Sequence, residues 1–128
     1  MPPPDDESRT VSLTVPARAD YLVLARLALS AVCRLTPLEP DEVVDLKLAV
    51  TEAASGVLNE NGAGPDGRLE FRFNLLDDRL ALQVQGDEQP GLSPEERQLG
   101  RAIIEATVDE YQEDGRAVRL VKYLNQEP

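Results

Sequence analysis

The chain has 128 residues, with 13 Lys and Arg against 24 Asp and Glu, which gives a formal net charge of −11. This length predicts a single domain, and the acidic excess argues against direct binding to nucleic acid because like charges repel. The sequence has no histidine and one cysteine, Cys33, which excludes an internal disulfide, a histidine general base and metal sites built from cysteine or histidine.

The first ten residues, MPPPDDESRT, are acidic and rich in proline. They lack the cationic start and apolar core of a signal peptide, so we expect residues 1–10 to be a disordered N-terminal tail and residues 11–125 to form the domain. The sequence also lacks the run of about 18 apolar residues that a membrane span needs. The expected location is therefore the cytoplasm, without contact to a membrane.

The segment Val11–Val15 alternates apolar and polar residues, which predicts a strand that ends at Pro16. From Ala17 to Leu35 the spacing becomes helical. The predicted inward stripe of this helix consists of Tyr21, Leu24, Ala25, Ala28, Val32 and Leu35.

The other side of this first helix carries Arg26, Ser30 and Arg34. Apolar residues lie between and beside them, namely Leu22, Val23 and Cys33. Cations set in apolar surface are typical of a protein interface, although an ordinary solvated helix face would give the same pattern. The acidic excess of the chain has two readings as well, since it favours solubility and also suits a basic protein partner.

The segment from Asp41 to Asn61 predicts a long amphipathic helix. Its apolar stripe consists of Val43, Leu46, Val50, Ala53, Val57 and Leu58, and its polar side of Asp41, Asp45, Glu52, Gly56 and Asn59. A glycine inside a helix costs roughly 1 kcal/mol relative to alanine. Gly56 is therefore an unusual residue, placed one turn after Glu52 on the polar side.

Two alternating runs follow, Arg68–Leu75 and Leu80–Gln85, joined by Asp77 and Asp78. They predict an antiparallel hairpin with one solvated face. In the first run the inward residues are Leu69, Phe71, Phe73 and Leu75.

Ser93-Pro94 then predicts a helix start, with serine as the cap and proline at the first helical position. The expected core stripe of that helix is Leu99, Ala102, Ile103 and Ala106. Asp114-Gly115 is a strong turn signal that joins a short strand near Val108–Gln112 to a strand over Ala117–Leu124.

The predicted order is β-α-α-β-β-α-β-β, which indicates an α+β fold. Helices are expected on one face of a mostly antiparallel sheet, in a two-layer α/β sandwich.

Four segments together resemble the RsbW/SpoIIAB group of bacterial anti-sigma factors and serine kinases. They are SLTVPAR, ARLALSAV, DEVVDLKLAVTEAASGVL and IIEATVDEYQEDGRAVRLVKYL. The resemblance covers nearly the whole domain and implies the histidine-kinase-type (GHKL) ATPase fold. It also implies a site for ATP and magnesium between the helices and a lid.

The first sequence box of that family is Glu-x-x-x-Asn, in which the glutamate polarises the attacking hydroxyl or water and the asparagine oxygen ligates magnesium. The resemblance places Glu52 at the catalytic glutamate, but Gly56 stands at the asparagine position. Asn59 lies on the same side of the helix one turn further, where its reach is displaced by several ångströms. The sequence offers no side chain as magnesium ligand at the family position.

The other two boxes of the family bind the adenine and the phosphates. In the second box, Asp-x-Gly-x-Gly, the best match is Asp87 with Gly91 after a one-residue insertion at Gly86, and glutamine replaces the first glycine. Without that insertion, Gly86 itself replaces the aspartate. In the glycine-rich lid only Gly100 matches, beside Arg101. All three boxes depart from the family pattern, so a bound nucleotide is possible by resemblance but is weakly supported by the residues.

The resemblance also implies that Arg26, with Ser30 and Arg34 beside it, contacts protein partners. These would be a sigma factor, an anti-anti-sigma protein of the STAS type, or both, and a homodimer is expected. Two functions stay open. One is an anti-sigma-type regulator that acts by partner switching with weak or lost ATP binding. The other is an active serine kinase with Glu52 as general base and Asp87 reading adenine.

Overall fold

The computed structural model describes residues 9–58, 67–86, 94–114 and 117–124. Its elements follow the predicted order and confirm the α+β class. They are β1 (Thr10–Pro16), a 3-10 turn η1 (Ala19–Tyr21), α2 (Leu22–Cys33), α3 (Pro40–Leu58), β2 (Arg68–Leu75), β3 (Arg79–Gly86), α4 (Pro94–Glu105), β4 (Glu110–Asp114) and β5 (Ala117–Tyr123).

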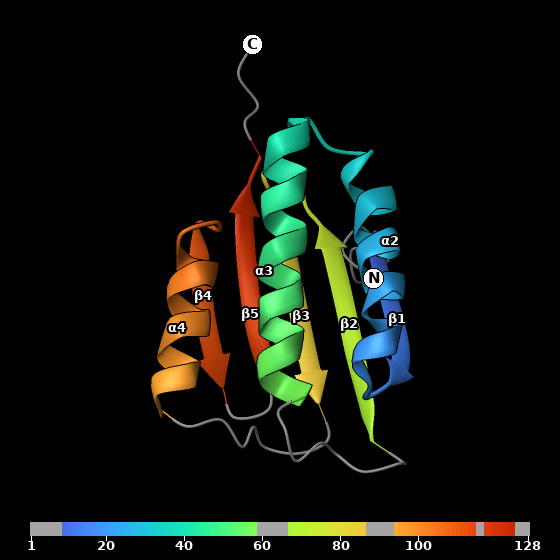
Figure 1. Cartoon of the computed structure of the whole chain (residues 1–128). Helices are drawn as coiled ribbons and strands as arrows, with labels where there is room; N and C mark the ends of the chain where they lie inside the picture. Colours follow the sequence, from blue (N-terminus) through green and yellow to red (C-terminus); the bar gives the residue numbers. More distant parts are fainter. Residues whose placement is uncertain (1–8, 59–66, 87–93, 115–116, 125–128) are drawn as a thin grey trace, which may run out of the picture.

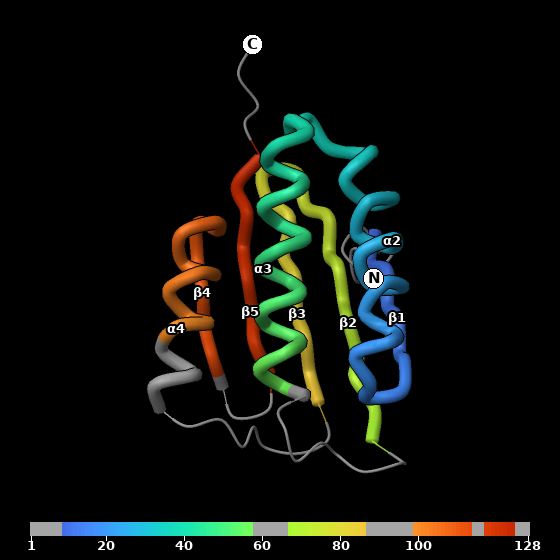
Figure 2. The backbone as a smooth tube through the Cα atoms, viewed as in Figure 1, coloured from blue at the N-terminus to red at the C-terminus, as the bar shows by residue number. Residues whose placement is uncertain are grey.

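The strands form one five-stranded sheet in the order β1-β2-β3-β5-β4, and every neighbouring pair is antiparallel. Figure 1 shows the three helices on one face of this sheet, with α2 near β1 and β2, α3 over the centre and α4 over β4. The tube in Figure 2 shows that α2 and α3 run in opposite directions side by side. The described part of the chain is therefore a two-layer sandwich.

The helix-facing side of the sheet supplies half of the core. Phe71 and Phe73 on β2 are fully buried, and the register places Phe71 between Leu13 of β1 and Val84 of β3. The alternation predicted for β2 is confirmed, because Leu69, Phe71, Phe73 and Leu75 are all buried. No polar or charged side chain is buried among the residues that the structure describes. Burial of apolar area is thus the main source of stability.

Helix α3 supplies the other half. The predicted stripe is confirmed at its centre, where Leu46, Val50, Ala53 and Val57 are buried. At its start the Glu42 carboxylate accepts a hydrogen bond from the Glu39 amide (2.9 Å), which satisfies one free N–H at the helix N-terminus. Glu42 also lies 3.8 Å from Lys122 of β5, so the same side chain joins the helix to the sheet.

The predicted core stripe of the first helix is confirmed at Ala25 and Val32 and was wrong at Tyr21, Leu24 and Leu35. Leu24 and Leu35 are exposed (41% and 74%), and the buried residues are Leu22, Ala25, Leu29, Val32 and Cys33. The helix is apolar on nearly every side, so its spacing alone allows more than one orientation on the sheet.

The predicted stripe of α4 was also wrong, because Leu99 is 66% exposed and Ala102 and Ala106 are exposed as well. Ile104 is the residue that α4 buries (3% exposed), while Ile103 is half-buried.

Boundaries moved by small amounts elsewhere. β1 begins at Thr10, one residue before the predicted start, and β4 begins at Glu110, two residues after it. In the described part of the chain no helix combines the length and apolar character that crossing a membrane requires.

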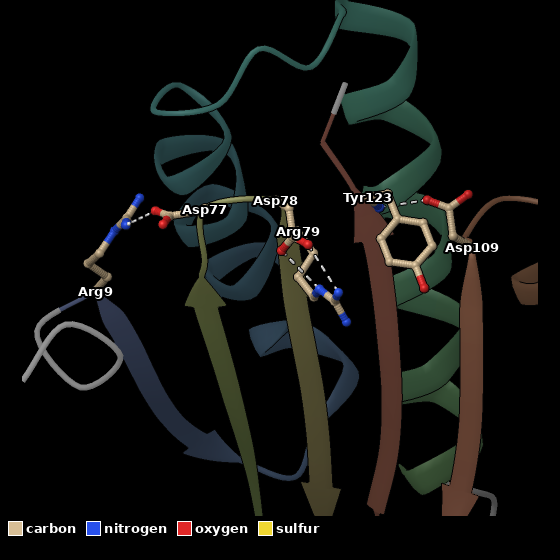
Figure 3. Close-up of polar contacts among 6 residues, drawn as sticks. All are labelled: Arg9, Asp77, Asp78, Arg79, Asp109 and Tyr123. Atoms are coloured by element: carbon tan, nitrogen blue, oxygen red, sulfur yellow. Dashed lines mark hydrogen bonds and ion pairs between the residues drawn. The ribbon is translucent and has the colours of Figure 1, made fainter. Parts of the chain in front are cut away.

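Polar contacts fasten one end of the sheet (Figure 3). Arg9 pairs with Asp77 at 3.1 Å, and the Asp109 carboxylate accepts a 2.6 Å hydrogen bond from the Tyr123 amide. Two hydrogen bonds from Arg79 hold the pKa of the exposed Asp78 carboxyl below its ordinary value. The first contact joins the start of β1 to the β2–β3 turn, and the second joins the start of β4 to β5, at the same end of the sheet.

The buried thiol of Cys33 gives a first prediction. Burial raises the pKa of Cys33 from 9.0 to about 11, although the charge of Lys47 opposes the shift. Because the thiolate is the reactive form, a disulfide reagent at about pH 8 should label the folded chain far more slowly than the urea-unfolded chain. The Cys33→Ala variant gives the unlabelled baseline.

The same shift fixes the sign of the pH dependence. The unfolded thiol loses its proton first, so the contribution of Cys33 to stability is complete below about pH 9 and is lost as the pH rises towards 11. Equal labelling rates for the folded and unfolded chains would contradict the burial of this thiol.

Candidate functional site

The two predicted nucleotide-site residues that the structure describes, Glu52 and Gly100, lie together. Glu52 is half-buried on α3, and α3 packs directly against α4. A Cβ built on Gly100 of α4 would lie 3.9 Å from the Glu52 Oε1 atom. The Glu52 carboxylate therefore faces the junction of the two helices, and among the described residues it has no hydrogen bond or ion pair.

The next turn of α3 offers no side-chain ligand for a metal ion. Gly56 is half-buried at the position where the family carries its asparagine, and a glycine has no side-chain oxygen. Magnesium prefers hard oxygen ligands, and the described residues contain no group of three or more His, Cys, Asp or Glu that could hold a metal ion. The predicted residues Asn59, Asp87 and Gly91 lie outside the described residues.

Arg101, the residue after Gly100, contacts β4. Its Nη2 atom lies 2.9 Å from Glu113 Oε1, and its guanidinium lies 5.7 Å from the centre of the Tyr111 ring. Tyr111 donates a hydrogen bond to the same Glu113 oxygen (3.3 Å). Burial raises the pKa of the Tyr111 hydroxyl, and the hydrogen bond to Glu113 raises the pKa of Arg101. This cluster fastens α4 to β4.

Sequence reasoning missed Tyr111 and Glu113 as site-supporting residues. The signal was present in the alternation of EYQED, because the register pairs Tyr111 with Leu120 and Glu113 with Val118, both of which are buried. Both residues therefore lie on the helix-covered face beneath α4.

The predicted partner residues lie on α2, as expected. Arg26 is exposed, and its Nη1 atom donates a 3.3 Å hydrogen bond to the Thr51 hydroxyl of α3. Thr51 in turn donates to the Lys47 carbonyl of its own helix (2.8 Å). Ser30 is half-buried, and Arg34 is exposed at the C-cap of α2. Arg26 thus links α2 to α3 at the residue that directly precedes Glu52 in the sequence.

Large apolar side chains are exposed on both of the helices that Arg26 joins. We call this the α2–α3 surface; it consists of Arg26 with Val23 (45% exposed) and Leu27 (61%) on α2, and Val44 (61%) and Leu48 (44%) on α3. The sequence predicted three apolar residues on the surface beside Arg26. Of these, Val23 is exposed, whereas Leu22 and Cys33 are buried in the core. The contribution of α3 was not predicted.

A separate hollow of about 620 Å³ lies along β3, β4 and β5. It is lined by Leu76, Arg79, Ala81, Glu110, Tyr111, Gln112, Arg119 and Val121. Arg79 stacks on the Tyr123 ring at its margin (5.2 Å to the ring centre). None of the predicted site residues lines this hollow, so the Glu52 site and the α2–α3 surface are both independent of it.

Comparison with known proteins decides the family. The family model for the histidine kinase-like ATPase domain matches residues 15–127. The chain is 31% identical to the serine-protein kinase RsbW of Bacillus licheniformis, over 91% of this chain and 87% of that protein. It is 32% identical to the RsbW kinase of Bacillus subtilis strain 168, over 91% of this chain and 74% of that protein.

The chain is an RsbW-like member of the histidine kinase-like ATPase family. A solved structure agrees with this fold, namely the crystal structure of the RsbU and RsbW domains of a Mycobacterium tuberculosis protein, with a TM-score of 0.68 and 17% identity. The match covers 90% of this chain and 32% of that longer chain, so it supports the fold alone.

The junction yields a prediction about Gly100. A Cβ there would make an ordinary contact with Glu52 at 3.9 Å, so Gly100→Ala should stabilise the chain by about 0.5–1 kcal/mol through helix propensity. Urea unfolding of the variant and the wild type measures the difference. A bulkier Gly100→Leu variant serves as the steric control, and a loss of stability in Gly100→Ala would mean that the junction is tighter than described.

Proposed function

We propose that this chain is an anti-sigma-type regulator that acts by partner switching and has weak or lost ATP binding. The observation that carries the proposal is the contrast between two sites of one scaffold. The α2–α3 surface presents Arg26 among exposed apolar side chains, whereas the nucleotide-site helix has glycine at position 56.

The nucleotide part of the proposal follows from the fit of the residues. Glu52 faces the α3–α4 junction, but a metal held there would receive no side-chain ligand from Gly56. Arg101, the cation on α4 that directly follows the glycine of this junction, is paired with Glu113. Neither residue supplies what a magnesium–phosphate group requires, namely hard oxygen ligands and free cationic donors. We therefore derive no phosphoryl-transfer step.

One observation favours the alternative of an active serine kinase. The resemblance assigns Glu52 the position of the family's general base, and its carboxylate is free of hydrogen bonds within the described residues. In that case magnesium would be held mainly by water and phosphate. The regulator without efficient nucleotide chemistry remains the better-supported function because Gly56 and the engaged Arg101 oppose ATP at two separate points.

The partner part rests on the chemistry of α2. Arginine surrounded by apolar side chains is typical of the centre of a protein interface. We propose that Arg26, with Ser30 and Arg34 near it, binds a sigma factor, a STAS-type anti-anti-sigma protein or both in turn. A homodimer that uses the same region of the chain is part of this proposal.

Reversal of the Arg26 charge tests the proposal. Arg26→Glu should weaken binding to the partner at least about tenfold, because it replaces the cation that the partner would contact with a carboxylate. The measurement is the affinity of the full chain for each purified sigma factor and STAS-domain protein of the same organism.

The matched control is Arg72→Glu, which reverses an exposed arginine on the opposite, sheet face. It should leave the affinity unchanged. If no member of the panel binds the wild type, or if Arg26→Glu binds as well as the wild type, the proposed partner surface is refuted.

A further inference from the structure

We propose that Arg101, Glu113 and Tyr111 form a latch between α4 and β4, and that α4 opens away from the sheet as a separate unit when this latch is released. The opening does not depend on the proposed function, because it concerns only how one helix is held on the sheet. It names the element of the chain that moves while the core stays folded.

The first observation is the small share of α4 in the core. Among the described side chains of this helix, residues 99–105, Ile104 alone is buried, and Leu99 is 66% exposed. By contrast, α2 and α3 each bury a whole row of side chains. Since apolar burial is the main source of stability, α4 is the helix that the described core holds least.

The second observation is a weak point within the helix itself. Gly100 lies inside α4, where a glycine lowers helix propensity because it loses more backbone freedom than other residues. Close packing does not require the glycine, since a Cβ there would lie 3.9 Å from Glu52 Oε1, an ordinary contact. Neither the core nor the backbone therefore holds α4 firmly.

The third observation is the polar contact that replaces them. Glu113 Oε1 accepts hydrogen bonds from Arg101 Nη2 (2.9 Å) and from the Tyr111 hydroxyl (3.3 Å), and the guanidinium lies 5.7 Å from the centre of the Tyr111 ring. The Glu113 side chain is only 18% exposed, so water screens this ion pair less than an open surface pair. Arg101 and Ile104 are three residues apart, which places the latch and the buried side chain on one face of α4.

The fourth observation is a pivot at the end of α4. Figure 1 shows that α4 leads into β4 through a short connection. The Thr107 hydroxyl and the Val108 amide both donate to the Ile104 carbonyl (2.9 and 3.1 Å). The Asp109 amide donates to the Val121 carbonyl of β5 (2.9 Å), so the connection stays tied to the sheet while α4 turns about it.

Opening has a consequence for the α3–α4 junction. α4 packs directly against α3, and the Glu52 carboxylate faces Gly100. Movement of α4 uncovers Glu52 and the side of α3 around it, whereas the latched helix covers them. The latch therefore controls access to this junction for any molecule that binds there.

Native-state amide hydrogen exchange of the full chain, followed by NMR at low urea concentrations, tests the latch. The amides of α4 should exchange faster than those of β2 and β3. Their rates should depend little on urea, because opening one helix exposes little surface. Glu113→Gln should raise the α4 rates about fivefold, since it removes the charged partner of Arg101.

A second variant tests whether the two charges act together. Arg101→Met keeps an apolar stem and removes the guanidinium, so it should also raise the α4 rates about fivefold. The double variant Arg101→Met/Glu113→Gln should show about the same increase as either single variant, because one contact is lost in all three.

Two control variants lie away from α4. Glu70→Gln removes a carboxylate that pairs with Arg72 on the sheet (3.2 Å), and it should leave the α4 rates unchanged. Val15→Ala weakens the core at β1, where Val15 is 4% exposed. It should raise the exchange of β2 and β3 at least about tenfold and leave α4 unchanged.

Two sets of results would overturn the proposal. If the α4 rates rise with urea or with Val15→Ala as steeply as those of β2 and β3, then α4 opens only when the whole domain unfolds. The urea series on the wild type makes this distinction even where a variant fails to fold. If Glu113→Gln leaves the α4 rates unchanged, or if the effects of Arg101→Met and Glu113→Gln multiply in the double variant, the contact is not a latch.

Discussion

The whole arrangement depends on burying one face of a five-stranded antiparallel sheet under α2 and α3. Phe71 and Phe73 from the sheet meet Leu29, Leu46 and Val50 from the helices in a core without buried polar groups. Only one face is covered by described helices, so each functional residue lies at a margin of the helix layer (Figure 1). The α3–α4 junction is one margin, and the outer side of α2 and α3 is the other.

Helix α3 contributes residues to both the α3–α4 junction and the α2–α3 surface, so the two sites share one rigid element. Thr51 accepts a hydrogen bond from Arg26 on the side of α2, and the adjacent Glu52 faces α4. A substitution at Gly56 would leave the positions of these side chains unchanged, because residue 56 belongs neither to the buried stripe of α3 nor to its contact with α2. The proposed partner surface therefore does not depend on which residue stands at position 56.

The strands could be predicted closely because strict alternation, as in Arg68–Leu75, has only one orientation on a sheet with one covered face. The helices α2 and α4 could not be oriented in the same way, since α2 is apolar on most sides and α4 carries an exposed Leu99 next to its half-buried and buried isoleucines. The Arg101–Glu113 contact could not be predicted, because it depends on the register of β4 on β5 and on the position of α4 over the sheet. Both are set by tertiary packing. The Glu52–Gly100 proximity was implied by family resemblance, whereas Val44 and Leu48 emerged only from the packing.

The most direct test of the central claim, a retained scaffold with a failed magnesium–ATP site, is calorimetric titration of the full chain with ATP at millimolar concentration in the presence of magnesium. The RsbW kinase of Bacillus subtilis, titrated under the same conditions, is the positive control. Our account predicts no saturable heat for this chain. Saturable heat that requires magnesium would contradict it.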